Sequence, residues 1–149
     1  MESFEDIAIG ADYLSPGRTV TEADVVAFAG LSGDYNELHT NAEFMRQHQF
    51  GQRIAHGLLG LAIQSGLATR TLPPSDIVGF LGINNWRFTR PIFIGDTVRL
   101  RIHAKEKRLS ASQGGRGIVV YERTIVNQRD EVVQHGEMAN LVACRVTDT

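Results

Sequence analysis

An acidic side chain and an imidazole lie five residues apart early in the chain, at Asp34 and His39. A carboxylate near an imidazole raises the basicity of the ring and fixes its orientation, which suits general acid–base chemistry. In an isolated pair of this kind, Asp34 is more often a turn residue and His39 a surface histidine than a catalytic group. The pair alone therefore does not decide between catalysis and structure.

Gly57 adds a third group, because it stands at the expected first turn of a helix. Its backbone N–H has no partner within the helix, and the helix dipole helps it to stabilise a developing oxyanion. An acid, a base and an oxyanion donor together fit proton abstraction beside a carbonyl group, or addition of water to an activated double bond. Two neighbours have structural roles available: His56 is favoured as a helix cap, and Ser65 fits a hydrogen bond to a backbone carbonyl.

The segment before this glycine is expected to contain two helices. Thr21 and Asp24 resemble a capping box that starts the first helix, and Gly30 marks its end. Residues 31–40, which contain the acid and the imidazole, are predicted to be a polar loop, and a short helix is predicted at 42–48. The catalytic pair would then be held between two helices.

Residues 57–68 are apolar at nearly every position, which indicates a helix that protein covers on all sides. Pro73 and Pro74 end this helix. Later in the chain the spacing of apolar residues changes to alternation, which is typical of half-buried strands. Strands are expected at 13–20, 77–88, 97–104, 118–126 and 132–145, with a hairpin loop at 110–117.

Helices followed by a run of strands predict an α+β fold. A curved antiparallel sheet wrapped around a long central helix is the hot-dog fold. No internal repeat or linker divides the sequence, so we expect residues 1–149 to form a single domain.

Composition excludes several classes of function. The net charge of −2 provides no field that would attract nucleic acid or an anionic membrane, and residues 57–68 are too short to span a bilayer. The single cysteine, Cys144, excludes an internal disulfide, and no signal-peptide pattern is seen, so a cytoplasmic protein is expected. Neither a metal nor a cofactor is expected, because the histidines lack paired ligand spacing and no glycine-rich nucleotide motif occurs.

Three segments occur in an order and at a spacing that a known family shares. They are residues 29–39 (AGLSGDYNELH), 53–57 (RIAHG) and 87–98 (RFTRPIFIGDTV). These segments resemble the MaoC-like dehydratases and (R)-specific enoyl-CoA hydratases, and the similarity runs from about Thr21 to the C-terminus.

This resemblance implies reversible hydration of trans-2-enoyl-CoA and dehydration of 3-hydroxyacyl-CoA thioesters. Asp34 and His39 would hold and activate the water that is added at C3. The Gly57 backbone N–H would bind the thioester oxygen, and Ser65 would support the acid–imidazole pair by hydrogen bonding. The implied substrate is an acyl-CoA thioester, and the implied assembly is a homodimer or dimer-based oligomer with two sheets joined edge to edge.

Glu37 and Arg53 stand where the family usually has proline. A carboxylate and a cation near the catalytic pair lead to the hypothesis that the acyl group is short or carries a polar function such as a carboxylate. The alternative, of equal weight, is that both are surface substitutions, for example paired with each other. The residues expected to bind substrate are Asn36, Glu37, Arg53, His56 and Arg87.

Two other functions stay open on the sequence. A hot-dog acyl-CoA thioesterase shares the fold and the helix N-terminus, but such enzymes generally carry a carboxylate on or beside the central helix. No acid lies between Gly57 and Thr71, which argues against this function. A non-catalytic acyl-CoA-binding module is the other alternative, and the intact acid–imidazole pair argues against it.

Overall fold

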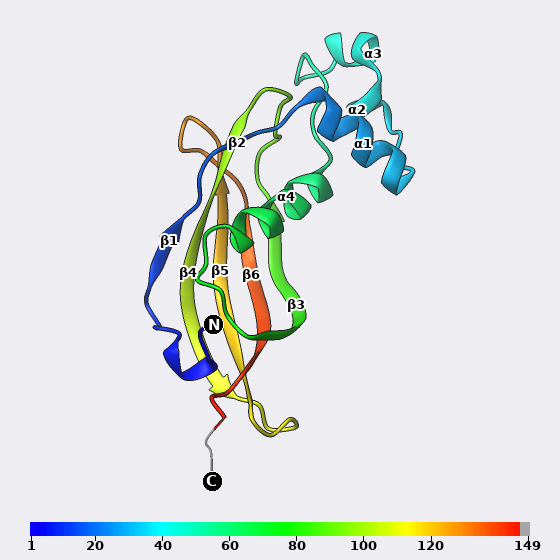
Figure 1. Cartoon of the computed structure of the whole chain (residues 1–149). Coiled ribbons are helices and arrows are strands. Elements are labelled where there is room, and N and C mark those ends of the chain that lie inside the picture. The colour runs from blue at the N-terminus through cyan, green and yellow to red at the C-terminus, as the bar shows by residue number, and fades with distance from the viewer. Residues whose placement is uncertain (147–149) are drawn as a thin grey trace.

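A six-stranded antiparallel sheet forms the body of the molecule in the computed structural model, which describes residues 1–146 (Figure 1). The strands are β1 (Asp12–Leu14), β2 (Arg18–Thr19), β3 (Ile77–Phe88), β4 (Thr97–Leu109), β5 (Arg116–Val126) and β6 (Val132–Ala143). Their order in the sheet is β1-β4-β5-β6-β3, and β2 also pairs with β4. The first long strand of the sequence, β3, therefore lies at the edge of the sheet.

The helices all lie in the first half of the described chain. They are η1 (Phe4–Asp6), a short 3-10 helix, and the α-helices α1 (Glu22–Ser32), α2 (Glu37–Thr40), α3 (Ala42–Arg46) and α4 (Gly57–Thr69). Figure 1 shows α4 against one face of the sheet, with α1, α2 and α3 gathered beyond its N-terminal end. Within residues 1–146, no helix is long and apolar enough to cross a membrane. The predicted α+β architecture is confirmed.

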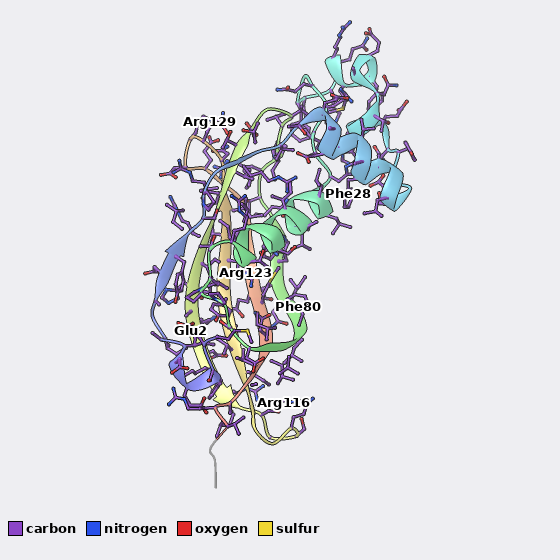
Figure 2. All side chains as sticks on the ribbon, in the orientation of Figure 1. Glu2, Phe28, Phe80, Arg116, Arg123 and Arg129 are labelled. Carbon is purple, nitrogen blue, oxygen red and sulfur yellow. The ribbon has the colours of Figure 1, made fainter. Side chains whose placement is uncertain are left out.

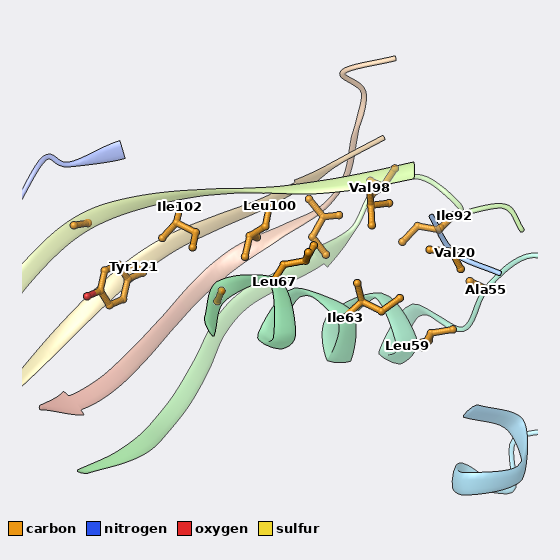
Figure 3. Packing of buried hydrophobic residues seen from close by; sticks show 14 of the residues in the cluster. Val20, Ala55, Leu59, Ile63, Leu67, Ile92, Val98, Leu100, Ile102 and Tyr121 are labelled. Carbon is orange, nitrogen blue, oxygen red and sulfur yellow. The ribbon is translucent and has the colours of Figure 1, made fainter. Parts of the chain in front are cut away.

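Alternation along β4 explains how the sheet holds α4. Leu100 and Ile102 are at most 1% exposed, whereas the residues between and beside them face solvent. Ile63 and Leu67 of α4 are at most 3% exposed and belong to the same apolar cluster, in which helix and strand side chains point toward one another (Figure 3). Burial of each such side chain contributes about 1.5–3 kcal/mol, so the apolar pattern fixes which face of α4 lies on the sheet.

Within residues 1–146 of one chain, protein covers α4 on one side only, so this chain alone does not provide the cover on all sides that the sequence predicts. Leu58 is 60% exposed, and Ala62, Ser65 and Gly66 are exposed as well. A single sheet layer contacts only one face of a helix, so the opposite apolar face needs cover from elsewhere.

The edge strand β3 also exposes apolar surface. Its outer edge pairs with no other strand in the described part of the chain, and Phe80, Leu81 and Phe88 are 57%, 49% and 53% exposed. A long apolar edge with free backbone groups is a template for pairing with another chain.

Two features near the candidate site differ from the predictions. Helix α1 passes Gly30 and ends at Ser32, and Gly33 caps it with a φ of 75°, in the left-handed region that glycine tolerates. The Gly33 N–H donates to the Ala29 carbonyl, which closes the helix. The predicted loop at 31–40 contains α2, so the imidazole lies on a short helix.

Strand boundaries differ as well. The strand predicted at 97–104 continues to Leu109, because its pairing with β5 extends to Gly117. The final strand ends at Ala143, before the predicted 145. The segment 13–20 forms two strands, β1 and β2, separated by the Pro16–Gly17 break.

Candidate active site

Asp34 lies in the turn between α1 and α2, and its two carboxylate oxygens face different groups. Oδ1 accepts a hydrogen bond of 3.2 Å from the Asn36 backbone N–H. Oδ2 lies 3.9 Å from Nε2 of His39. Asn36 itself caps α2 by accepting from the Leu38 N–H, so its side chain serves the turn. The turn thereby aims one carboxylate oxygen at the imidazole.

His39 is a buried residue, 8% exposed. Its Nδ1 lies 2.8 Å from the carbonyl oxygen of Ile54. Because a carbonyl only accepts, Nδ1 carries the proton, and Nε2 of the neutral ring is an acceptor that faces Asp34. Two acceptors 3.9 Å apart do not bond to each other, but a water molecule between them can donate one hydrogen to each. The geometry fits a pair that holds and deprotonates water.

His56 supports both members of this pair. Its ring stacks on His39 with centroids 3.8 Å apart, and its Nε2 donates a 2.9 Å hydrogen bond to the Asp34 carbonyl. Phe28 packs on the same ring at 4.9 Å. The prediction that the His56 side chain caps α4 is wrong, because this side chain makes no capping hydrogen bond to the helix. The structural role of His56 is therefore to position Asp34 and His39.

Gly57 is the first residue of α4, and within the described residues its N–H makes no hydrogen bond. Its carbonyl accepts a 3.0 Å bond from the Gln134 side chain, whose oxygen accepts from the Trp86 indole. A Cβ at this position would lie 2.9 Å from the Phe88 ring. Glycine is thus required by the close approach of Phe88, and Gln134 anchors the helix turn that presents the free N–H.

His39 and Gly57 line the same cavity, which has a volume of about 290 Å³. Phe88, Pro91 and Ile92 form apolar walls of this cavity. An apolar lining lowers the local dielectric constant, which strengthens the interaction of an N–H donor with a developing negative charge. The cavity therefore brings together an imidazole, which can accept a proton, and a backbone N–H that is free to donate.

Ser65 lies apart from these groups. It stands eight residues after Gly57, about 12 Å along the helix axis, and it lines a different cavity. Its hydroxyl donates to the Ala62 carbonyl at 2.7 Å. Within one chain the structure does not bring Ser65 to the acid–imidazole pair, and the backbone hydrogen bond predicted as its alternative is present.

Glu37 and Arg53 are not paired with each other. Arg53 forms an ion pair with Glu22 of α1 at 2.5 Å, and its hydrogen bond holds the pKa of the Glu22 carboxyl below its usual value. Glu37 is the first residue of α2 and accepts from the Asn41 side chain at 3.1 Å. Proline and acidic residues are both favoured at the first position of a helix. Glu37 can therefore begin α2 where the family usually has proline.

Arg87 is exposed on β3 and lines neither the cavity of His39 nor that of Ser65. The buried polar residues that were not predicted include Gln134, beneath the start of α4, and Arg123, on β5. The strand alternation contains a signal for Arg123, because it occupies the same face as Val119 and Ile125. An arginine on the apolar face of a strand needs a partner or a ligand.

Asp34, His39 and His56 place three potential metal ligands within 4.8 Å of one another. The imidazole rings of His39 and His56 are stacked with an interplanar angle of 27°. The lone pair of a ring nitrogen lies in the plane of its ring. The two stacked rings therefore hold their lone pairs in nearly parallel planes, which does not favour binding of one ion by both rings. The arrangement fits a water between Asp34 and His39 better than a coordinated ion.

Comparison with known proteins identifies the family. The profile of the MaoC-like domain matches residues 5–127. The protein MaoC of Klebsiella aerogenes is 36% identical over 104 residues, which are 70% of this chain and 31% of that protein. The (R)-specific enoyl-CoA hydratase of Rhodospirillum rubrum is 38% identical over 96 residues, 64% of each protein. The chain thus spans less than two thirds of these relatives.

Solved structures agree with the profile. A protein of Archaeoglobus fulgidus described as a monoamine oxidase regulatory protein superimposes with a TM-score of 0.89 and 36% identity, over 97% of this chain and 96% of that one. A Mycobacterium tuberculosis protein described as a double hot-dog fold has a TM-score of 0.83 and 20% identity, over 99% of this chain and 46% of that one, and shows the fold. The chain has the hot-dog fold and belongs to the MaoC-like dehydratase family.

Proposed function

We propose that this protein is a hydro-lyase that hydrates trans-2-enoyl-CoA and, in reverse, dehydrates (R)-3-hydroxyacyl-CoA thioesters. The observation that carries the proposal is the pair of acceptors, Asp34 Oδ2 and His39 Nε2, separated by 3.9 Å. The free N–H at Gly57 lies in the same cavity as His39. The name of the Rhodospirillum rubrum relative supports the same chemistry.

In the hydration direction, the water between Asp34 and His39 gives a proton to His39 Nε2 while its oxygen bonds to C3. The electrons of the C2–C3 double bond move to the thioester oxygen, and this enolate accepts a hydrogen bond from the Gly57 N–H. The imidazolium then returns a proton to C2, which completes the addition of water. Asp34 orients the water and stabilises the imidazolium.

We further propose that residues 1–149 act as one domain and that two copies join along β3 to form a homodimer. The free, apolar outer edge of β3 supports this assembly, as does the exposed face of α4 that carries Leu58. A twofold contact is the commonest way to cover such a surface.

Loss of enoyl absorbance on adding crotonyl-CoA tests the hydratase. Asp34→Asn and His39→Ala are each expected to lower kcat by about 10²–10⁴-fold, because general acid–base groups contribute that much. The exposed pair Asp12 and His103, linked at 2.7 Å outside the site, supplies the matched controls Asp12→Asn and His103→Ala. Both controls should retain wild-type rates.

Near wild-type turnover in His39→Ala would reject the assigned roles. CoA release without hydration of any enoyl-CoA would instead indicate the thioesterase. Binding of acyl-CoA with neither reaction would indicate a binding module. The three functions thus give different results with the same substrate and the same wild-type protein.

A further inference from the structure

A second, larger cavity of about 630 Å³ runs beside α4. Its walls are mostly apolar and include Leu61, Phe80, Ile83 and Met138. Gly57 lines the smaller cavity, and Leu61, one helix turn further along the same side of α4, lines the larger one. An acyl group that extends from Gly57 along this side of the helix would be directed toward the larger cavity.

Arg123 is a cation within this apolar cavity. It lies on β5, where Figure 2 labels it, and it is 5% exposed. Burial lowers the pKa of its guanidinium to about 10, so the group is still charged at pH 7. Transfer of a charge out of water is unfavourable unless a partner compensates it.

The described residues give Arg123 little compensation. Its Nη1 donates to Gln64 Oε1 at 2.9 Å, its guanidinium lies 6.0 Å from the centroid of the Tyr121 ring, and its Nε is buried without a hydrogen-bond partner. Within residues 1–146, no carboxylate forms an ion pair with it, and no acidic residue lines the cavity. The Gln64 amide nitrogen points to Met138 Sδ at 3.3 Å, which leaves the amide oxygen for Arg123. Gln64 therefore orients the guanidinium without neutralising it.

We propose that Arg123, oriented by Gln64, binds a carboxylate at the far end of the acyl group, so that the preferred thioesters are those of dicarboxylic acids. This inference rests on the proposed action on acyl-CoA thioesters. Gln64, which holds the guanidinium, lies seven residues after Gly57, about 10 Å further along the helix axis. Methylene groups between the two ends pack on the apolar walls.

A carboxylate matches this site better than a hydroxyl or carbonyl group. The planar guanidinium offers N–H donors in a fork that a carboxylate accepts in two places. An uncharged acyl terminus would leave the buried cation without an anion. The buried Asn140, which also lines the cavity, adds a further amide at the same end.

Binding of saturated thioesters, measured by isothermal titration calorimetry, tests this site without turnover. Adipyl-CoA and hexanoyl-CoA have acyl groups of equal length and differ in the terminal carboxylate. The wild type is expected to bind adipyl-CoA about tenfold or more tightly than hexanoyl-CoA. Succinyl-CoA and suberyl-CoA, which are shorter and longer, test the distance between Gly57 and Arg123.

Arg123→Met should remove the preference for adipyl-CoA and leave or improve binding of hexanoyl-CoA. The matched control is Arg116→Met, an exposed arginine on the same strand. Arg123→Lys keeps the charge but not the fork, so an intermediate preference is expected. A buried ion replaced by an apolar residue usually leaves stability unchanged or raised, and thermal unfolding checks that each variant is folded.

Tighter binding of hexanoyl-CoA by the wild type would overturn the proposal, and so would an equal loss of both ligands in folded Arg123→Met. If that variant does not fold, the wild-type comparison still decides. A retained adipyl-CoA preference in a protein that hydrates no enoyl-CoA keeps this site and rejects the hydro-lyase. Hydration of trans-2-hexenoyl-CoA by a protein that binds adipyl-CoA no more tightly than hexanoyl-CoA would support the hydro-lyase and reject the carboxylate site.

Discussion

At the scale of single residues, the site depends on how His39 is held as much as on His39 itself. One ring nitrogen is fixed by the Ile54 carbonyl, and one ring face is fixed by His56. These contacts leave a single acceptor nitrogen directed at Asp34. For the proposed reaction, this fixed position means that the imidazole needs little reorganisation before it accepts a proton.

His56→Phe is expected to lower kcat with little change in KM, because the phenyl ring keeps the stacking but loses the donor to the Asp34 carbonyl. A displacement of catalytic groups by 1 Å costs as much as about 10²-fold in rate. Steady-state kinetics with crotonyl-CoA measures the change. His56→Gln, which keeps an N–H donor, should recover part of the rate. Equal loss in both variants would contradict the positioning role.

Gly57→Ala is expected to lower kcat by about 10²–10³-fold, the effect of losing one oxyanion donor. The new methyl group would lie 2.9 Å from the Phe88 ring, so α4 must shift and carry the N–H away from the thioester oxygen. The double variant Gly57→Ala with Phe88→Ala makes room for the methyl and should recover rate. No recovery in crotonyl-CoA kinetics would show that the methyl obstructs the substrate directly.

Local spacing together with the family resemblance singles out Asp34, His39 and Gly57, and the fold brings His39 and Gly57 to one cavity. Contacts between segments that are far apart in the sequence cannot be predicted in this way. The role of His56 needed the Asp34 carbonyl, which is 22 residues away in sequence. Arg123 was visible only as an irregularity in strand alternation, because its partner Gln64 is 59 residues distant.

At the scale of elements, two helices are predicted before α4, and both are present with different ends: α1 continues to Ser32, and α3 ends at Arg46 rather than at residue 48. The left-handed Gly33, rather than Gly30, ends α1, since only this position closes the last turn. The Asn36 side chain starts α2 in a stretch whose composition indicated a loop. Capping by one side chain thus decides whether His39 lies on a helix or in a loop.

The ion pair of Arg53 with Glu22 joins the segment before α4 to α1, and its contribution to stability should depend on pH. Arg53 holds the folded pKa of Glu22 below its usual value of 4.5. The stabilisation is therefore present above pH 4.5 and is lost as the pH falls through the lower folded pKa.

Arg53→Met should reduce the free energy of unfolding at pH 7 by about 0.2–1 kcal/mol, the usual contribution of a solvent-accessible ion pair; the side chain of Glu22 is 55% exposed and that of Arg53 is 20% exposed. Urea unfolding at pH 7 and pH 3 measures the free energy of unfolding of wild type and variant. The difference between these two free energies should be smaller at pH 3. Glu22→Gln should show the same pattern. A difference that is equal at both pH values would mean that Arg53 acts through packing.

At the scale of the whole molecule, the surface that one chain leaves uncovered is the informative feature. The apolar pattern of α4 predicts complete burial, but the sheet of the same chain covers only one face of the helix. The edge strand β3 exposes further apolar side chains. A sequence records that a surface is apolar but not which chain covers it. The homodimer proposed here supplies that second chain.

The variant Leu81→Lys, which places a charge on β3, should convert the dimer into monomers. Leu81 is 49% exposed and lines neither cavity, so the charge would oppose strand pairing without entering the substrate site. Leu14→Lys is the matched control, since Leu14 is 56% exposed on β1 at the opposite edge of the sheet. Sedimentation velocity of the wild type and both variants measures the assembly. A monomeric wild type, or a dimer that Leu14→Lys alone dissociates, would exclude pairing through β3, and the exposed faces of β3 and α4 would then need another partner.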